Sequence, residues 1–369
     1  MRKRGEPARR ILRSSSWVIM LIAAVTEVVA QEPPGAGLYR AACAACHGAD
    51  GKGPPEGRKL TVPTPDLTDC SFATREPDAD WMAVIHQGGP VRKFDETMPA
   101  FGESLSTDQI QQILDHVRGF CQDGRWPRGE LNLPRSFFTE KAYPEDEAVS
   151  TLSIDDAQRR VVNELVYERR FGASTQFELK IPFGGQEQSP ANEWRGGLGD
   201  LVLGVKQVLH HNLEWGTILS VGAELQAPTG STSTGMGVNT WVAEPFVAFG
   251  KALPRDAFVQ LLAEAELPSN ESQAEREAGL RAVFGRTFTA GTWGRTWTPM
   301  LEVLVARELE SGAELEWDLV PQVQVSLSTR QHVLGNVGVR FPVTETGRPT
   351  QFLFYILWDW FDGGFFDGW

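Results

Sequence analysis

Leu38-Tyr39-Arg40-Ala41-Ala42-Cys43-Ala44-Ala45-Cys46-His47-Gly48 is the stretch that decides how the first part of this chain folds. It contains the pattern C-x-x-C-H, in which two thiols lie about one helical turn apart. Thiols at this spacing reach the two vinyl groups of one haem, and the next histidine lies beneath the iron. The pattern predicts one covalent haem c, bonded to Cys43 and Cys46 and ligated by His47. A redox-active or zinc-binding C-x-x-C is disfavoured because the sequence has no second such motif.

The N-terminus carries the pattern of an export signal. An apolar run from Trp17 to Val29 ends in Val28-Val29-Ala30, and six basic residues precede it: Arg2, Lys3, Arg4, Arg9, Arg10 and Arg13. A membrane-spanning helix needs about 20 apolar residues, which is more than this run offers. The order predicts a secretory signal peptide over residues 1–30, with an uncleaved anchor as the alternative.

The composition indicates the number of domains, disfavours one class of partner and predicts a disulfide. The 369 residues leave room for two domains, and 35 Lys and Arg face 48 Asp and Glu, a formal net charge of −13. An acidic balance argues against nucleic-acid binding, which needs basic patches. Outside the haem motif only Cys70 and Cys121 remain, and they can pair only with each other within the chain. In an oxidising compartment such a pair is expected to form a disulfide.

A second axial ligand is expected on the haem iron, and a thioether in that position raises the reduction potential. Met98 is the preferred candidate, because Pro99 and Gly102 hold its segment in a loop from which the backbone can direct the side chain inward. The alternatives are Met82, His86 and His116. The first two fall in a predicted helix over residues 79–87, where ordinary packing or surface roles fit them better. His116 fits a surface position.

A further helix is predicted to begin after Ser106, which can cap the free amides of its first turn. Ile110, Ile113, Leu114 and Val117 recur at helical spacing, and Gly119 ends the pattern. Residues from Leu38 to Cys121 thereby resemble a class I c-type cytochrome, with Asp50-Gly51-Lys52-Gly53 as the polar turn after the haem motif. The resemblance implies an all-helical domain over residues 31–123, whose axial ligands are His47 and Met98.

Beyond a Pro- and Gly-rich stretch over residues 124–156, interpreted as a linker, the periodicity changes from helical to alternating. Apolar residues occupy every second position over residues 175–183, 201–209, 217–225, 258–267 and 315–327. Segments of about ten residues with this period are typical of transmembrane β-strands. Aromatic residues near strand ends, namely Trp194, Trp215, Trp241, Trp293 and Trp297, suit an interfacial girdle. We therefore expect residues 157–369 to form an antiparallel outer-membrane β-barrel of about 10–12 strands, twelve being preferred because such barrels have even numbers.

This second half resembles the outer-membrane channel family linked to phenol-degradation pathways. The matching pieces are the segments over residues 139–147 and 199–206 and the Trp358-Asp359 ending, and the last strand followed by Trp369 is similar to a barrel-sorting signal. The whole architecture resembles the fused cytochrome-porins of iron-oxidising bacteria, although their segment before the haem motif has no counterpart here.

These features predict electron transfer by a monohaem domain that is held in the periplasm by a lipid-embedded barrel and serves a periplasmic redox partner protein. The first alternative is a solute channel with a haem domain for regulation or docking. The second is an enzyme such as a peroxidase, which requires that Met98 does not bind the iron. A haem with both axial positions filled favours a carrier over a catalyst.

Overall fold

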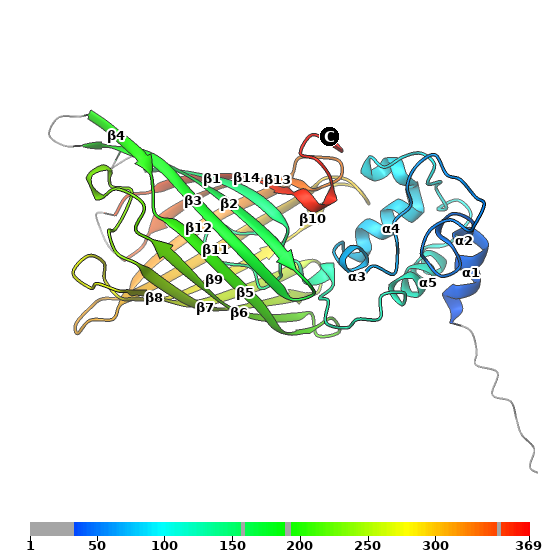
Figure 1. Ribbon diagram of the computed structural model, residues 1–369, viewed down its shortest axis with the longest axis horizontal. Coiled ribbons are helices and arrows are strands. Elements are labelled where there is room, and N and C mark those ends of the chain that lie inside the picture. Colours follow the sequence, from blue (N-terminus) through cyan, green and yellow to red (C-terminus); the bar gives the residue numbers. More distant parts are fainter. Residues whose placement is uncertain (1–32, 156–158, 189–192, 345–347) are drawn as a thin grey trace, which may run out of the picture.

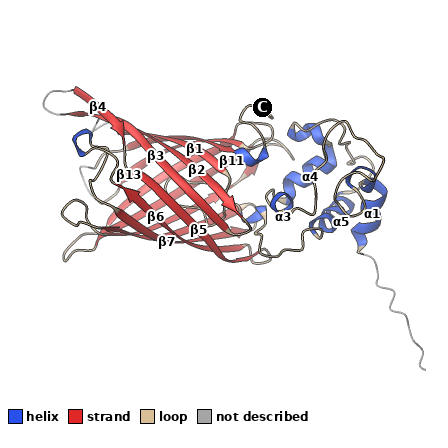
Figure 2. Cartoon of the chain, in the orientation of Figure 1, coloured by secondary structure: helices blue, strands red, loops and turns tan. Residues whose placement is uncertain are grey.

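The computed structural model describes residues 33–155, 159–188, 193–344 and 348–369, so the predicted signal peptide over residues 1–30 lies outside the described residues. A helical domain precedes a β-barrel and lies against one of its ends (Figure 1, Figure 2). No helix in the described ranges is both long enough and apolar enough to span a membrane.

The first domain is only partly helical, which corrects the all-helical expectation. Long irregular segments over residues 48–69 and 93–106 separate its helices. The helical elements are α1 (Pro34–Ala42), α2 (Ala44–His47), α3 (Cys70–Ala73), α4 (Asp78–Gln87), the short 3-10 turn η1 (Gly89–Arg92) and α5 (Thr107–Arg118). Glycine and proline in the irregular stretches favour turns over continued helix.

Helix α5 follows the predicted pattern. Ser106 is its N-cap and accepts a hydrogen bond from the Gln109 amide, while the Gln109 side chain accepts one from the Ser106 amide. This reciprocal arrangement satisfies two free donors at the helix start. The predicted apolar stripe is buried, and Gly119 is the C-cap.

Helices α1 and α5 cross in close contact, and a glycine makes this possible. A Cβ atom added to Gly35 would lie 1.8 Å from the Gln112 carbonyl oxygen of α5. Next to this contact, the Tyr39 ring packs against Phe120 and its hydroxyl donates to the Gly48 carbonyl at 2.8 Å. The crossing fixes the start of the haem motif against the last helix of the domain.

The second half is a closed antiparallel barrel of twelve strands, in agreement with the preferred count. Its strands are β1 (Glu147–Asp155), β2 (Arg160–Phe171), β3 (Thr175–Gln188), β5 (Leu201–Asn212), β6 (Thr217–Ala227), β7 (Val242–Leu253), β8 (Ala257–Pro268), β9 (Glu277–Arg286), β11 (Thr296–Glu308), β12 (Glu316–Ser326), β13 (Val333–Pro342) and β14 (Gln351–Asp359). Pairing of β1 with β14 and of β9 with β11 completes the ring. Two short pieces, β4 (Glu193–Leu198) and β10 (Phe288–Thr289), pair with the ends of β3 and β11. The sheet consequently has no open edge along its main strands.

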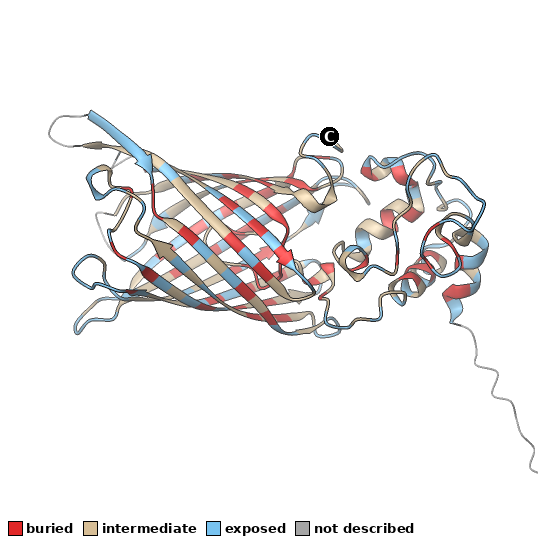
Figure 3. Ribbon diagram, in the orientation of Figure 1, coloured by how far each residue is buried: buried red, intermediate tan, exposed pale blue. Residues whose placement is uncertain are grey.

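The polarity of the barrel is inverted relative to a soluble protein. In β2, Leu165 and Tyr167 point outward and are exposed, whereas Glu168 and Arg170 point inward and are buried. The same alternation runs along the other long strands, seen as stripes of buried and exposed residues (Figure 3). An apolar outer wall around a polar interior is the pattern of a barrel that sits in lipid.

The two ends of the barrel differ in loop length. At the end that carries the helical domain most connections are short, over residues 172–174, 213–216, 254–256 and 327–332, whereas the connection from β9 to β11 spans residues 287–295 and contains β10. At the opposite end they include the longer loops over residues 228–241, 269–276 and 309–315. Bacterial outer-membrane barrels have short periplasmic turns and longer extracellular loops.

The stretch predicted as a linker, residues 124–156, differs from the expectation in two ways. Its last residues form β1, so the barrel begins at Glu147 rather than at residue 157. Residues 129–146 pass into the barrel lumen, where Leu131 and Tyr143 pack among inward-facing wall residues such as Phe246. We call residues 129–146 the luminal segment. Its irregular backbone is stable there because polar wall residues satisfy it, which periodicity in the sequence cannot reveal.

Replacement of Gly35 by alanine should destabilise the helical domain, because the new Cβ forces α1 away from α5. We expect the free energy of unfolding to fall by about 1–3 kcal/mol, as for other overpacked sites. Urea unfolding of the full chain, followed by helical circular dichroism, measures the change. Gly37→Ala is the matched control, because its Cβ meets no atom within 4 Å. Equal stability of the two variants would contradict the close crossing.

Candidate functional site

The haem motif forms one tight turn at the end of the first helix. The amides of Cys46 and His47 both donate to the Cys43 carbonyl, at 3.1 and 3.0 Å. The Gly53 amide then donates to the His47 carbonyl at 3.0 Å and closes the predicted polar turn. Cys43 and Cys46 are both free thiols, and each is partly buried. The turn thus gathers two unbonded thiols and one imidazole.

The environment of the motif is apolar and leaves one nitrogen of the imidazole without a polar partner. His47 Nδ1 is buried and has no hydrogen-bond partner among the described residues. Burial lowers the pKa of His47, which favours the neutral ring that can ligate a metal. Burial, followed by the charge of Cys46, raises the pKa of Cys43 to about 11.

Two apolar clusters meet beside the motif. Cys43 packs against the first cluster, which contains Tyr39, Leu67, Ile113 and Val117. Met98 packs against the second, which contains Met82, Ile85, Ile110 and Leu114. The side chains of Trp81 and Leu105 contact both clusters. The preferred axial-ligand candidate therefore borders the same continuous apolar region as Cys43.

The other ligand candidates lie in settings that explain them without a metal. Met82 is buried in the second cluster as a packing residue. The His86 ring lies against Gly102, where a Cβ would come within 2.3 Å of it, and near Trp293. His116 is not a plain surface residue as expected, since its ring packs between Tyr39 and Phe120 with centroids 5.2 and 5.0 Å away.

A disulfide ties the middle of the helical domain to its end. Cys70 at the start of α3 is bonded to Cys121 just beyond α5, with Cα atoms 5.0 Å apart. Beside it, the Arg118 guanidinium donates to Asp78 at 2.9 Å and lies over the Trp81 ring at 4.7 Å. The disulfide and Arg118 together hold α3 and α4 against α5. Arg118 also contacts Trp81, which packs against the apolar region.

A tryptophan of the barrel packs into the apolar region of the helical domain. Trp293, in the connection between β10 and β11, packs against the cluster that contains Met98, and its carbonyl accepts a hydrogen bond of 2.7 Å from Arg92. The sequence placed Trp293 in the interfacial girdle, and this assignment is wrong because the residue lies at the joint between the domains. Trp215 and Trp297 at the same rim are exposed, as a girdle residue would be. Trp293 differs from these two tryptophans in its proximity to the helical domain, which the spacing of residues in the sequence does not reveal.

Charged contacts hold the joint together. Arg75 of the helical domain pairs with Asp146 of the luminal segment and lies 4.4 Å from the Phe361 ring centroid. Arg330, in the turn before β13, donates to the Lys93 carbonyl at 3.2 Å and lies over the Phe94 ring at 4.6 Å. These contacts fix the Met98 side of the domain toward the barrel, whereas α1 and α2 lie on the far side (Figure 1).

A known protein family matches part of the chain in its helical half. Residues 30–117 match the family model described as cytochrome C oxidase, cbb3-type, subunit III. This stretch is therefore similar to a cytochrome c-type domain. No curated protein sequence matches the chain.

Solved structures similar to this chain include porins and outer-membrane proteins. An outer membrane channel from Pseudomonas putida F1 has 15% identity and a TM-score of 0.45, covering 61% of this chain and 99% of the other. LpxR from Salmonella typhimurium has 11% identity and a TM-score of 0.38, covering 57% and 99%. The KdgM porin has 14% identity and a TM-score of 0.38, covering 57% and 98%.

The residues present fit a covalently held haem. Its attachment needs two unbonded thiols one turn apart, an imidazole free of other partners and an apolar crevice. Cys43 and Cys46 supply the first, the His47 ring with its unpartnered Nδ1 the second, and the region shared by Trp81 and Leu105 the third.

Removal of the disulfide by the double substitution Cys70→Ala and Cys121→Ala should destabilise the helical domain. A closed loop of this length implies a loss of about 3–4 kcal/mol on the chain-entropy model. Chemical unfolding of the full chain under non-reducing conditions measures the loss, and the same unfolding of the reduced parent chain serves as the control. An unchanged unfolding midpoint would show that the bridge does not constrain the domain.

Proposed function

We propose that this chain is an electron carrier anchored in the outer membrane, with one covalent haem c whose iron is bound by His47 and Met98. The observation that carries the proposal is His47, whose buried Nδ1 atom has no hydrogen-bond partner among the described residues, next to two free thiols. Met98 borders the same apolar region and is the candidate for the opposite axial position. With both positions filled, the site favours outer-sphere electron transfer over substrate chemistry.

The outer surface of the barrel supports an outer-membrane location. Its wall exposes a belt of apolar side chains, including Leu203, Leu261, Leu301 and Val337. Exposed tryptophans flank this belt at both ends, with Trp215 and Trp297 at one rim and Trp194, Trp241 and Trp317 at the other. Aromatic girdles on both sides of an apolar band mark the two membrane interfaces. The short turns at the helical-domain end support a periplasmic position for that domain.

Different residues of the chain have different roles in such a carrier. A haem supplies a one-electron couple when bound. The apolar side chains around Trp81 and Leu105 exclude water, and a methionine thioether stabilises the reduced state. Ala45 lies exposed between the two motif cysteines in α2, and α2 lies on the side of the domain that faces away from the barrel (Figure 1). We infer that a periplasmic redox partner protein docks on this side.

The alternative of an open solute channel is disfavoured by the luminal segment. Glu302 of β11 accepts hydrogen bonds from the Phe138 and Thr139 amides, at 3.1 and 2.6 Å, and from the Ser136 hydroxyl at 3.1 Å. Gln260 of β8 donates to the Pro134 carbonyl at 2.8 Å. A segment bonded to the wall on several sides obstructs the passage of solutes.

The ligand assignment is tested by Met98→Leu in the full chain, with Met82→Leu as the control from the same cluster. Both variants should retain covalent haem. Met98→Leu should lose the long-wavelength charge-transfer band of methionine-ligated ferric haem and lower the midpoint potential, because the thioether no longer favours the reduced state. Redox titration with absorption spectra measures both. An unchanged band and potential in Met98→Leu would exclude Met98 as the ligand.

The obstruction of the lumen is tested in planar bilayers. The parent chain should show no steady open conductance. Glu302→Ala should permit openings, because each buried amide that loses its acceptor costs about 1–3 kcal/mol and the segment loosens. Glu266→Ala, at a luminal carboxylate of β8, should stay closed. A steady ohmic pore in the parent chain would instead favour the channel function.

A further inference from the structure

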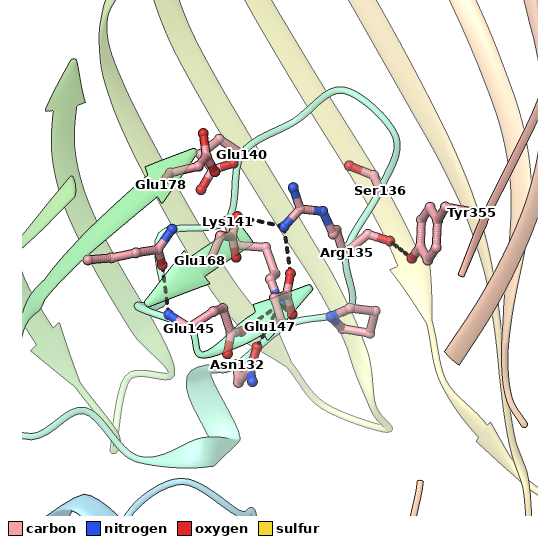
Figure 4. Close-up of polar contacts among 12 residues, drawn as sticks. Asn132, Arg135, Ser136, Glu140, Lys141, Glu145, Glu147, Glu168, Glu178 and Tyr355 are labelled. Carbon is pink, nitrogen blue, oxygen red and sulfur yellow. Dashed lines mark hydrogen bonds and ion pairs between the residues drawn. The ribbon is translucent and has the colours of Figure 1, made fainter. Parts of the chain in front are cut away.

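Three carboxylates converge inside the barrel where the luminal segment meets the wall. They belong to Glu140 of the luminal segment, Glu168 of β2 and Glu178 of β3, and one oxygen from each lies within 4.8 Å of the others. Glu140 and Glu178 point toward each other in the close-up, with Glu168 nearby (Figure 4). Three side chains from three separate segments thus face one point.

One oxygen of each carboxylate is already bound to a cationic side chain. Glu140 Oε1 pairs with Lys206 at 2.5 Å, Glu168 Oε1 with Arg135 at 2.8 Å, and Glu178 Oε1 with Lys180 at 3.1 Å. These pairs orient the groups and leave the second oxygen of each for another contact.

Two of the second oxygens are unsatisfied. Glu168 is 0% exposed and Glu178 is 7% exposed, and the Oε2 atom of each is buried without a hydrogen-bond partner in the described part of the chain. A buried carboxylate oxygen without a partner is costly, more so than a neutral acceptor. This observation is independent of the clustering and indicates that a hydrogen-bond donor or a cation belongs beside them.

A small void adjoins the cluster. It has a volume of about 10 Å³ and is lined by Glu140, Glu178, Lys206 and Glu224 together with apolar residues such as Val205 and Phe246. A space of roughly this size holds one water molecule or one small ion.

The charge balance of the surrounding ion-pair network is negative. The ion pairs link six carboxylates, Glu140, Glu145, Glu147, Glu168, Glu178 and Glu224, to four cations, Arg135, Lys141, Lys180 and Lys206. Two negative charges are in excess when all ten groups are ionised. Uncompensated charge inside a protein is strongly unfavourable, so either a bound cation or bound protons must offset about two units of charge.

We propose that Glu140, Glu168 and Glu178 bind one hard divalent cation of the Ca²⁺ class. Carboxylate oxygens coordinate Ca²⁺ at about 2.3–2.6 Å, so oxygens up to roughly 5 Å apart can share one ion. The spread of the three carboxylates lies within that limit. An all-oxygen ligand set disfavours the softer metals that seek thiolate or imidazole. The ion supplies the two missing charges and joins the luminal segment to β2 and β3.

The test uses the full chain in detergent, stripped with EDTA and dialysed against Ca²⁺. We expect one bound Ca²⁺ per chain by elemental analysis, and a thermal midpoint several degrees higher with Ca²⁺ than with EDTA, because a ligand that binds only the folded state stabilises it. Glu178→Gln should lose at least tenfold in Ca²⁺ affinity, and its midpoint should no longer respond to EDTA.

The matched control is Glu266→Gln, which neutralises a luminal carboxylate outside this network and should keep both responses. Heat-modifiable gel mobility verifies that each variant folds, and Glu140→Gln replaces Glu178→Gln if the latter does not fold. Absence of stoichiometric Ca²⁺ in the parent chain, with a midpoint indifferent to EDTA, would overturn the proposal and show that shared protons neutralise the cluster. Undiminished Ca²⁺ binding by the folded glutamine variant would overturn it equally.

Discussion

The Arg135 guanidinium, enclosed in the barrel between Glu147 and Glu168, is the interaction on which the rest of the structure depends. Its distances to the two carboxylates are 2.5 and 2.8 Å, and both carboxylates are buried. Removal of one partner from a buried ion pair costs about 3–5 kcal/mol, because the remaining charge stays uncompensated. The buried carboxylates of the barrel wall are therefore compensated only with the luminal segment in place, and Arg135 of that segment is compensated only inside the barrel. Since that segment connects the two domains, the same contact fixes where the helical domain emerges.

The helical domain is held at the barrel end by contacts on its Met98 side and leaves its motif side free. Trp293 of the barrel packs against the Met98 cluster, while Arg75 reaches Asp146 at the mouth of the lumen. A carrier that exchanges electrons by encounter needs an accessible cofactor edge and a fixed position relative to its membrane. The division of the domain into an attached side and a free side meets both needs.

The sequence predicted those parts of the fold whose determinants are local. The spacing of Cys43, Cys46 and His47, the Ser106 cap and the period-two strands each encode a feature within about ten residues. The luminal segment and Trp293 escaped prediction because their environment comes from residues far away in the chain. Tyr143 lies in a stretch whose sequence predicts a linker, yet its side chain is buried against β5 to β8. The periodicity of the neighbouring residues does not indicate this burial. The carboxylate cluster escaped for the same reason, since Glu140, Glu168 and Glu178 converge only in the closed barrel.

The central claim is that Cys43 and Cys46 hold a haem whose iron is ligated by His47. Intact-mass spectrometry of the full chain, produced in cells competent for cytochrome maturation, tests it most directly. The account predicts a mature chain heavier by one haem, and loss of that increment when both cysteines are replaced by alanine. A parent chain without added porphyrin mass would contradict the account.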